Sequence, residues 1–316
     1  MAHPRQQRID PAKIARGAKK GSPAARPKAT AADWIAAARL RTLSLSIAPV
    51  ALGSATASVA HGFDLTIALL CLAVAVLLQI GVNYANDYSD GVRGTDNFRV
   101  GPSRLTGSGA AKPKQVLTVA LAFMAAGALA GAAVIMLSQH WWLFAVGAVA
   151  LVAAWFYTGG KRPYGYYGLG EIVSFLFFGI VATVGTTFVQ LDRVTPDTWV
   201  AAVAIGLFVA AVMLVNNLRD RAQDALAGKR TLSVLIGDRA SRVLFAVLML
   251  APYGLLVFFT LFYPRATLVY FTLLAALPTV LIVLTAKTSR EFILALKLTS
   301  LTALLFGLGL AAAIAF

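Results

Sequence analysis

The chain has 316 residues, of which 59% are hydrophobic and only 13% are charged, and its mean hydropathy is +0.76. An average soluble domain carries roughly 25% charged residues, so this composition excludes a soluble globular protein and indicates an integral membrane protein. A single cysteine, Cys71, excludes an intrachain disulfide and a cysteine-based metal cluster. The net charge of +15 comes from bases that precede or flank apolar segments, which favours membrane topology over binding to nucleic acid.

The chain divides into a short polar leader and a long apolar region. Residues 1–30 are rich in Pro, Ala and basic residues and lack the apolar stretch of a secretory signal, so we expect a disordered basic cytoplasmic tail. Residues 31–316 are expected to form one domain. Backbone polar groups in lipid must be satisfied internally, so each apolar segment of near ~20 residues predicts a transmembrane helix. There are nine such segments: 43–60, 65–84, 115–137, 141–158, 171–190, 198–216, 243–262, 266–286 and 293–315.

The basic residues predict how these helices are oriented. Lys and Arg are retained on the cytoplasmic side of short loops. With nine spans, 26 of the 28 basic residues fall on one side, and only Arg193 and Arg265 fall on the other. We therefore expect an all-α membrane protein with its N-terminus in the cytoplasm and its C-terminus outside.

The second apolar segment, which includes IALLCLAVAVLLQIGV, ends in the polar stretch NYANDYSDGVRGTD, Asn83 to Asp96. Asn83 and Asp87 are four residues apart, as are Asn86 and Asp90. Residues four apart lie on one face of a helix. The stretch therefore predicts a helical extension that carries a ladder of oxygen atoms.

A similar ladder follows the sixth apolar segment, in the stretch NNLRDRAQDALAGKRTL, Asn216 to Leu232. Asn216, Asp220 and Asp224 again step by four residues. The two ladders lie four helices apart, which is typical of an internal pseudo-repeat, although the halves share little sequence. Two such ladders can face each other across a cavity.

Five of the thirteen acidic residues fall in these two stretches: Asp87, Asp90, Asp96, Asp220 and Asp224. Carboxylates that converge repel one another unless a cation lies between them. Mg²⁺ is the natural candidate, because it prefers carboxylate, amide and water oxygens and often shares substrate phosphates. No His or Cys lies near either ladder, which argues against zinc or copper. The alternative interpretation is a set of solvated acids paired with neighbouring arginines.

Basic residues near the ladders suggest a phosphorylated substrate, because the planar guanidinium of arginine suits phosphate oxygens. For each of them the alternative role is to set topology. The basic residues concerned are Arg93, Lys161, Arg162, Arg219, Lys229 and Arg230. Tyrosines accompany the basic pair in YTGGKRPYGYYGLGE, and for Tyr164, Tyr166 and Tyr167 a place in the interfacial aromatic belt is the favoured interpretation.

These motifs carry a resemblance to a known family. NDYSD together with DRAQD, after helices two and six, resembles the UbiA superfamily of membrane prenyltransferases. The longer stretches GPSRLTGSG, YTGGKRPYGYYGLGE and NNLRDRAQDALAGKRTL are similar to those of its 1,4-dihydroxy-2-naphthoate polyprenyltransferases, which act in menaquinone biosynthesis. The resemblance covers about residues 33–316. RLRTL, residues 39–43, resembles the R-P-R-T-L segment of the family, but Leu40 replaces the usual proline.

The resemblance implies nine helices around a central cavity that opens toward the cytoplasm and sideways into lipid, in the cell membrane. It also implies the site residues. Mg²⁺ would be held by Asn86, Asp90, Asp220 and Asp224. The diphosphate of a polyprenyl diphosphate would be bound by Lys161, Arg162, Arg219, Lys229 and Arg230, with Arg93 in the first loop.

The implied reaction transfers a long polyprenyl group to 1,4-dihydroxy-2-naphthoate with loss of carbon dioxide, giving demethylmenaquinone after oxidation. The proton acceptor is Asp87, Tyr157 or Glu171, and the sequence does not choose among them. Another acceptor, such as 4-hydroxybenzoate, haem or a sugar phosphate, is one alternative function, and a divalent-cation or phosphate transporter is another. No pattern in the sequence indicates the isoprenoid chain length or the oligomeric state.

Overall fold

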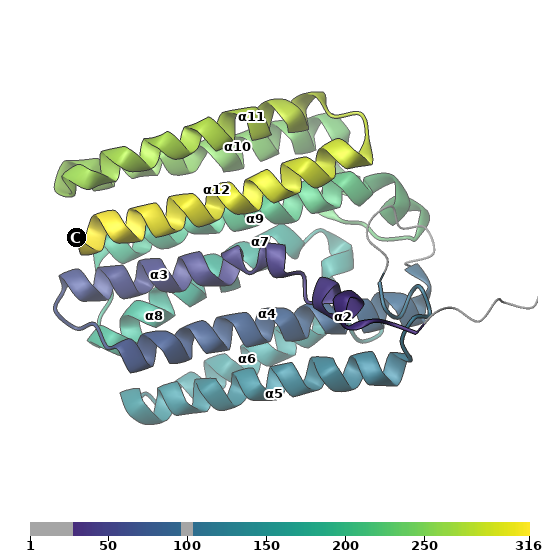
Figure 1. Cartoon of the computed structure of the whole chain (residues 1–316), viewed down its shortest axis with the longest axis horizontal. Coiled ribbons are helices and arrows are strands. Elements are labelled where there is room, and N and C mark those ends of the chain that lie inside the picture. The colour runs from purple at the N-terminus through teal and green to yellow at the C-terminus, as the bar shows by residue number, and fades with distance from the viewer. Residues whose placement is uncertain (1–27, 96–103) are drawn as a thin grey trace, which may run out of the picture.

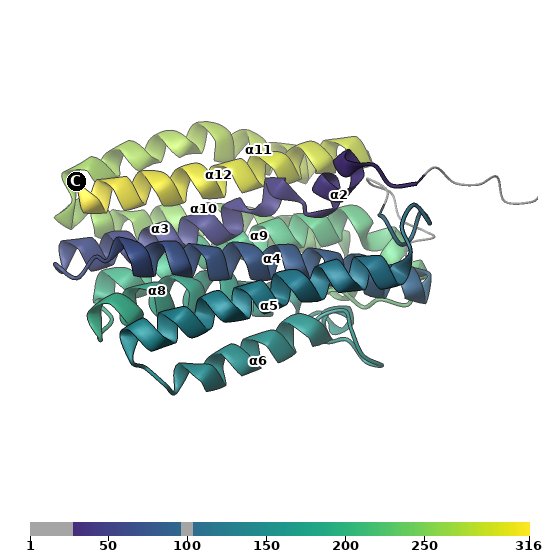
Figure 2. The ribbon, with the colours of Figure 1, turned by 60° about the horizontal axis from the view of Figure 1, so that its bottom comes forward.

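The computed structural model describes residues 28–95 and 104–316, so most of the predicted tail lies outside the described residues. Every regular element in the described parts is helical, and the long helices run side by side along one axis (Figures 1 and 2). The α-helices are α2 (Ala31–Ala37), α3 (Ser44–Val59), α4 (Leu65–Arg93), α5 (Pro113–Ser138), α6 (Leu143–Phe156), α7 (Gly170–Ser174), α8 (Ala182–Leu191), α9 (Pro196–Leu226), α10 (Leu232–Phe262), α11 (Leu273–Thr285) and α12 (Ser289–Ala315). Short 3₁₀ turns form η1 (Leu40–Thr42), η3 (Tyr164–Tyr167) and η5 (Pro264–Thr272), and η4 (Phe175–Val181) is a π-helix between α7 and α8.

All nine predicted apolar segments are mainly helical, and the all-helical membrane fold is confirmed. Within the described residues, seven helices are long and apolar enough to cross a bilayer, or up to eight if the bent pair 31–42 and 44–59 forms one span. The helix α6 has 14 residues. At 1.5 Å per residue it extends about 21 Å, less than the ~30 Å hydrocarbon core. The number of nine spans therefore stays a prediction.

Helix ends coincide with residues that can satisfy the unpaired backbone groups there. Thr30 and Thr288 begin α2 and α12 with reciprocal capping boxes, and the side chain of Asp64 accepts a hydrogen bond from the Ile67 amide at the start of α4. Gly94 ends α4 in the left-handed conformation, with φ 73°. The helical extension predicted after the second apolar segment is therefore part of α4 itself.

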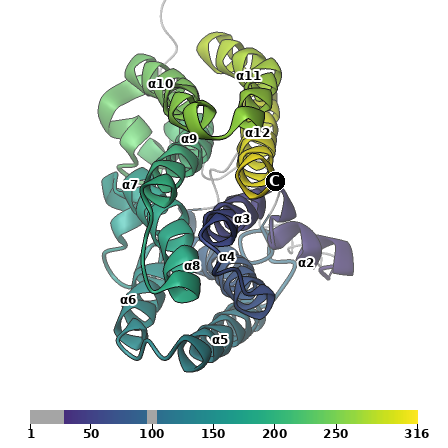
Figure 3. The same ribbon diagram turned by 90° about the vertical axis from the view of Figure 1, so that its left-hand side faces the viewer.

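The core centres on α9, which the end-on view shows among α10, α12, α3 and the α7–α8 segment (Figure 3). Seventeen of its residues are buried. Gly206 on α9 and Gly179 on η4 allow the two backbones to touch, since a Cβ added to Gly179 would lie 2.4 Å from the Cα of Gly206. This close approach places the last turns of α9 beside the loop that precedes α7.

The chain bends between α2 and α3 at Arg39, which has φ 56°. Side chains of α4 hold the bent segment: the hydroxyl of Tyr84 donates to the Trp34 carbonyl at 2.7 Å, and the amide of Asn83 donates to the Ala38 carbonyl at 3.0 Å. The bend brings residues 39–45 against the ends of α4 and α9. It thereby adds bases to the site described next.

Candidate active site

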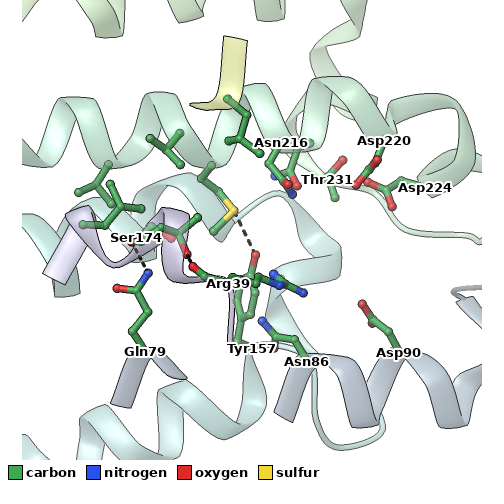
Figure 4. A pocket seen from close by; sticks show the side chains of 18 of the residues that line it. Arg39, Gln79, Asn86, Asp90, Tyr157, Ser174, Asn216, Asp220, Asp224 and Thr231 are labelled. Carbon is green, nitrogen blue, oxygen red and sulfur yellow. Dashed lines mark hydrogen bonds between the residues drawn. The ribbon is translucent and has the colours of Figure 1, made fainter. Parts of the chain in front are cut away.

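A polar pocket of about 150 Å³ lies where α4 and α9 end, at the end of the bundle opposite the C-terminus. Asn86 and Asp90 reach it from α4, and Asp220 and Asp224 reach it from α9 on the facing side (Figure 4). The structure thus brings the predicted metal ligands of both ladders to one pocket. Asp96 lies outside the described residues.

Asp90 is 2% exposed and has partners on both carboxylate oxygens. One oxygen forms ion pairs with Arg104 at 2.5 Å and with Lys229 at 3.1 Å, and the other accepts a hydrogen bond from the Tyr166 hydroxyl at 2.5 Å. Burial and the negative charge of Asp90 raise the pKa of Tyr166, so this hydroxyl keeps its proton at neutral pH. Arg104 and Tyr166 were not among the predicted site residues.

On the facing ladder, Asp220 binds Arg219 through two hydrogen bonds, at 2.7 and 2.5 Å. Arg219 also donates to Asn216 at 3.1 Å. Its side chain is fully buried in the described structure and does not line the pocket, although Asn216 and Asp220 do. The structure therefore places Arg219 behind the acids, where it compensates their charge.

Asn86 is oriented by the Thr158 hydroxyl, which donates to its side-chain oxygen at 2.6 Å. Arg93, one turn beyond the ladder, donates to the carbonyls of Thr158 and Gly160. It lines neither the polar pocket nor the larger cavity described below. Arg93 thus ties the end of α4 to the loop that follows α6, which carries Tyr157 into the pocket.

The three predicted proton acceptors have different surroundings. Asp87 accepts hydrogen bonds from the backbone amides of Leu105 and Thr106, both at 2.9 Å, and does not line the pocket. Glu171 is 3% exposed and accepts a hydrogen bond from the Asn217 amide at 2.9 Å, so it lies behind the pocket wall. Tyr157 alone of the three lines the pocket.

Some of the basic residues predicted to bind the diphosphate also line the pocket, and others do not. Lys229 lines the pocket, whereas Lys161, Arg162 and Arg230 are exposed and do not. Asn216 of the second ladder also lines the pocket. The polar lining residues that were not predicted are Arg39, Arg41, Thr42, Gln79, Arg104, Tyr166, Ser174, Asn217 and Thr231. Three of these are basic: Arg39, Arg41 and Arg104. They lie in the motifs RLRTL and GPSRLTGSG, which were both quoted for the family resemblance. Those motifs were the signal that could have identified the three arginines.

A second, larger cavity adjoins the polar pocket. Its volume is about 540 Å³, and mostly apolar side chains from α3, α4, α5, α6, η4 and α8 line it. Five residues line both spaces, and we call this set the neck: Asn86, Tyr157, Ser174, Phe178 and Met213. The Tyr157 hydroxyl donates to the Met213 sulfur at 3.3 Å across the neck. One ligand with a charged head and an apolar tail could occupy both spaces.

The donor set suits a magnesium ion that shares substrate phosphates. Asn86, Asp90, Asp220 and Asp224 supply amide and carboxylate oxygens to one pocket, which is the chemistry that Mg²⁺ prefers. Across the described ranges, no three His, Cys, Asp or Glu side chains form a preassembled metal site. Since Mg²⁺ usually binds through one or two carboxylates plus substrate phosphates, these residues fit joint binding of the ion and a diphosphate.

Comparison with known proteins gives consistent results. The model of the UbiA prenyltransferase family matches residues 46–301. A 1,4-dihydroxy-2-naphthoate octaprenyltransferase of Mycobacterium tuberculosis is 47% identical over 91% of this chain and 98% of its own. The protein of the same name in Escherichia coli is 36% identical over 77% of this chain and 81% of its own.

Two solved structures share the fold. An apo UbiA homolog from Aeropyrum pernix superposes with a TM-score of 0.66 at 18% identity, covering 84% of this chain and 96% of its own. A UbiA homolog from Archaeoglobus fulgidus bound to DMAPP and Mg²⁺ gives 0.62 at 15% identity, covering 89% and 99%. The chain therefore belongs to the UbiA prenyltransferase family, and the prediction of a membrane-spanning enzyme that transfers a prenyl group is confirmed.

Proposed function

We propose that this enzyme transfers a polyprenyl group from a polyprenyl diphosphate to 1,4-dihydroxy-2-naphthoate, in menaquinone biosynthesis. The observation that carries the proposal is the junction of the two spaces at the neck. A diphosphate in the polar pocket and an isoprenoid tail in the apolar cavity place the allylic carbon beside Tyr157 and Met213. The acceptor is assigned from the relatives at 47% and 36% identity, both named for dihydroxynaphthoate.

The residues of the polar pocket would bind the diphosphate and stabilise its charge. Bound Mg²⁺, held by Asn86, Asp90, Asp220 and Asp224, would supply positive charge to the leaving diphosphate. Lys229 and Arg104, both paired with Asp90 here, are placed to exchange this carboxylate for phosphate oxygens. Arg219 would maintain the charge balance of Asp220 from behind. Lys161, Arg162 and Arg230 are exposed outside the pocket, so we assign them a smaller part in binding the diphosphate.

In the proposed reaction the allylic carbon–oxygen bond breaks, and its electron pair leaves with the diphosphate. The ring carbon that bears the carboxylate forms the new bond to the allylic carbon. The carboxylate then leaves as carbon dioxide, and the electrons of that bond restore the aromatic ring. The product is demethylmenaquinol, which oxidation converts to demethylmenaquinone. The apolar cavity excludes water from the allylic carbon, which would otherwise be hydrolysed.

Tyr157, one of the three residues predicted as proton acceptors, is assigned to the position beside the hydroxyl groups of dihydroxynaphthoate. It lines both spaces and carries a polar atom at the neck. Glu171 would act indirectly by orienting Asn217, and Asp87 by holding the backbone of Leu105 and Thr106. The carboxylate leaves as carbon dioxide, so the overall reaction of the ionised acceptor releases no proton. Tyr157 keeps its own proton, and its oxygen would accept a hydrogen bond from a hydroxyl of dihydroxynaphthoate.

We also propose that all nine apolar segments span the cell membrane, with the polar pocket facing the cytoplasm. The excess of bases on that side supports this orientation, and α2 and the C-terminus lie at opposite ends of the bundle (Figure 1). Single cysteines replacing Lys161 and Arg193, in a Cys71→Ser background, test it in intact cells. A membrane-impermeant maleimide should label position 193 and spare position 161, and the reverse pattern would invert the topology.

The function is tested with detergent-purified protein, a polyprenyl diphosphate and either dihydroxynaphthoate or 4-hydroxybenzoate, with Mg²⁺ or with EDTA. The expected result is a prenylated, decarboxylated naphthoquinol that forms only with Mg²⁺. If product formed from hydroxybenzoate alone, the assignment of the diphosphate site would stand, but the assigned prenyl acceptor would be wrong. Failure to release diphosphate with any acceptor would contradict the proposal.

A further inference from the structure

Tyr166 connects its own turn to two other segments that are far apart in the sequence. It lies in the 3₁₀ turn η3, between α6 and α7. Its hydroxyl donates to Oδ1 of Asp90 at 2.5 Å, and the Nζ atom of Lys229 lies 4.6 Å from its ring centroid. Its carbonyl accepts a hydrogen bond from the Arg230 amide at 2.8 Å. One side chain and its backbone thus connect α4, the α6–α7 loop and the α9–α10 loop.

The two ends of this side chain contact groups of different chemistry. The hydroxyl is a neutral donor to Asp90, whose other oxygen is bound by Arg104 and Lys229. The ring face attracts the positive charge of Lys229, and the guanidinium of Arg93 lies 5.5 Å from the same ring. When Lys229 turns to a phosphate, the hydroxyl contact still fixes Asp90, because it does not depend on either cation.

The neighbouring tyrosines of the same turn lack these contacts. The Tyr164 hydroxyl donates to the Ala153 carbonyl at 2.8 Å, on the preceding helix α6. Tyr167 is 54% exposed and lines neither cavity. The sequence favoured an interfacial role for all three tyrosines, but the contacts of Tyr166 differ in kind from those of an interfacial anchor.

We propose that Tyr166 is a positioning residue: its hydroxyl orients Asp90 toward a divalent cation, and its ring holds Lys229 for the diphosphate. The assignment rests on the proposed function, because it gives Tyr166 a role at that site. The two halves are separable by mutation. Tyr166→Phe removes the hydroxyl and keeps the ring, whereas Tyr166→Leu removes both. Tyr167→Phe, in the same turn, is the matched control.

The first measurement is binding without turnover. Purified protein in detergent is titrated with Mg²⁺ at fixed inorganic pyrophosphate, and then with pyrophosphate at fixed Mg²⁺, while the rise in Tm is followed. A hydrogen bond to a charged group is lost in Tyr166→Phe, so its Kd for Mg²⁺ should rise about tenfold with little change for pyrophosphate. Tyr166→Leu should show the same change for Mg²⁺ and a further rise of about fivefold for pyrophosphate. Tyr167→Phe should match the wild type.

Steady-state kinetics supply the second measurement. Tyr166→Phe should need about tenfold more Mg²⁺ for half-maximal rate and should recover most of its kcat at saturating Mg²⁺. A uniform loss of kcat with unchanged Mg²⁺ dependence would assign Tyr166 a merely structural role and overturn the inference. Wild-type binding of both ligands by Tyr166→Phe would overturn it as well, while leaving the proposed function intact. If the wild type binds neither Mg²⁺ nor pyrophosphate, both proposals are wrong.

Discussion

The amide of Asn217 on α9 donates a 2.9 Å hydrogen bond to Oε1 of Glu171 on α7, in the wall of the polar pocket. Asn217 lines the pocket and Glu171 lies behind it, 3% exposed. The second carboxylate oxygen, Oε2, has no hydrogen-bond partner within the described structure. The pair therefore fixes which atom of the Asn217 amide faces the pocket.

This pair separates two roles for Glu171. Glu171→Gln keeps an oxygen acceptor for Asn217, so we expect activity within about threefold of the wild type, since the hydrogen bond survives. Glu171→Ala leaves the buried amide unpaired at a cost of about 1–3 kcal/mol, and activity should fall roughly tenfold or more. Initial rates and Tm of both variants check this. Equal, large losses of rate in both would identify Glu171 as the proton acceptor instead.

The acids that line the pocket should be essential. Asp90→Ala and Asp224→Ala should each leave a folded protein with at least about a hundredfold less activity, the scale of losing a main charge stabiliser. Asp238→Ala is a matched control, because Asp238 is 43% exposed, pairs with Arg242 and lies outside the pocket. Wild-type turnover in either pocket variant, measured as release of diphosphate, would contradict the assignment of the metal ligands.

The bases should differ according to their burial. Arg104 and Lys229 are 10% and 13% exposed and line the pocket, whereas Lys161 and Arg162 are exposed outside it. Arg104→Ala and Lys229→Ala should raise the KM for the polyprenyl diphosphate about tenfold or more, because charge-assisted hydrogen bonds are the stronger ones. Lys161→Ala and Arg162→Ala should change it less. The reverse order would show that the loop after α6 closes over the substrate.

Substitution of two glycines by alanine should affect stability differently. A Cβ at Gly179 would lie 2.4 Å from the Cα of Gly206, so Gly179→Ala forces η4 away from α9. Overpacking of this kind costs about 1–3 kcal/mol, and Tm should fall. Gly185 has no atom within 4 Å of an added Cβ, so Gly185→Ala should leave Tm unchanged. Thermal unfolding in detergent compares the two, and an equal Tm would refute the close contact.

Gly185 also lines the apolar cavity. Gly185→Leu should therefore narrow the space for the isoprenoid tail without touching the polar pocket. We expect the KM to rise for long donors and to stay near the wild-type value for geranyl diphosphate. Competition between a long and a short donor in one reaction measures the shift, and an unchanged preference would place the tail elsewhere.

Spacing in the sequence correctly indicated which residues share a helix face, but it could not indicate what each face meets. Asn83 and Asp87 have the same spacing as Asn86 and Asp90. In the structure the first two side chains bind the Ala38 carbonyl and the Leu105 amide, while Asn86 and Asp90 line the pocket. The difference depends on neighbours that are 18 to 45 residues away in the chain.

Two of the three pocket arginines, Arg39 and Arg41, were missed for a related physical reason. Arg39 and Arg41 come before the first apolar segment, where positive charge is expected from topology alone. Only the bend at Arg39, with its left-handed φ of 56°, turns this segment toward α4 and α9. The helical class and the apolar segments, by contrast, follow from local hydrophobicity, and they were predicted correctly. The length of α6 was not, since an apolar run does not show where its helix begins.

The neck has a consequence for how the products part. Before reaction, one molecule would extend through it, with its charged end among the acids and its tail in the apolar cavity. After transfer, no covalent bond crosses from one space to the other. The diphosphate, which carries charge, would depart toward water, and the prenylated quinol, which has none, would partition into lipid. Each product would then leave from its own space without passing through the neck. Transfer of the diphosphate to water and of the quinol to lipid would both be favourable, so release of the products is favoured.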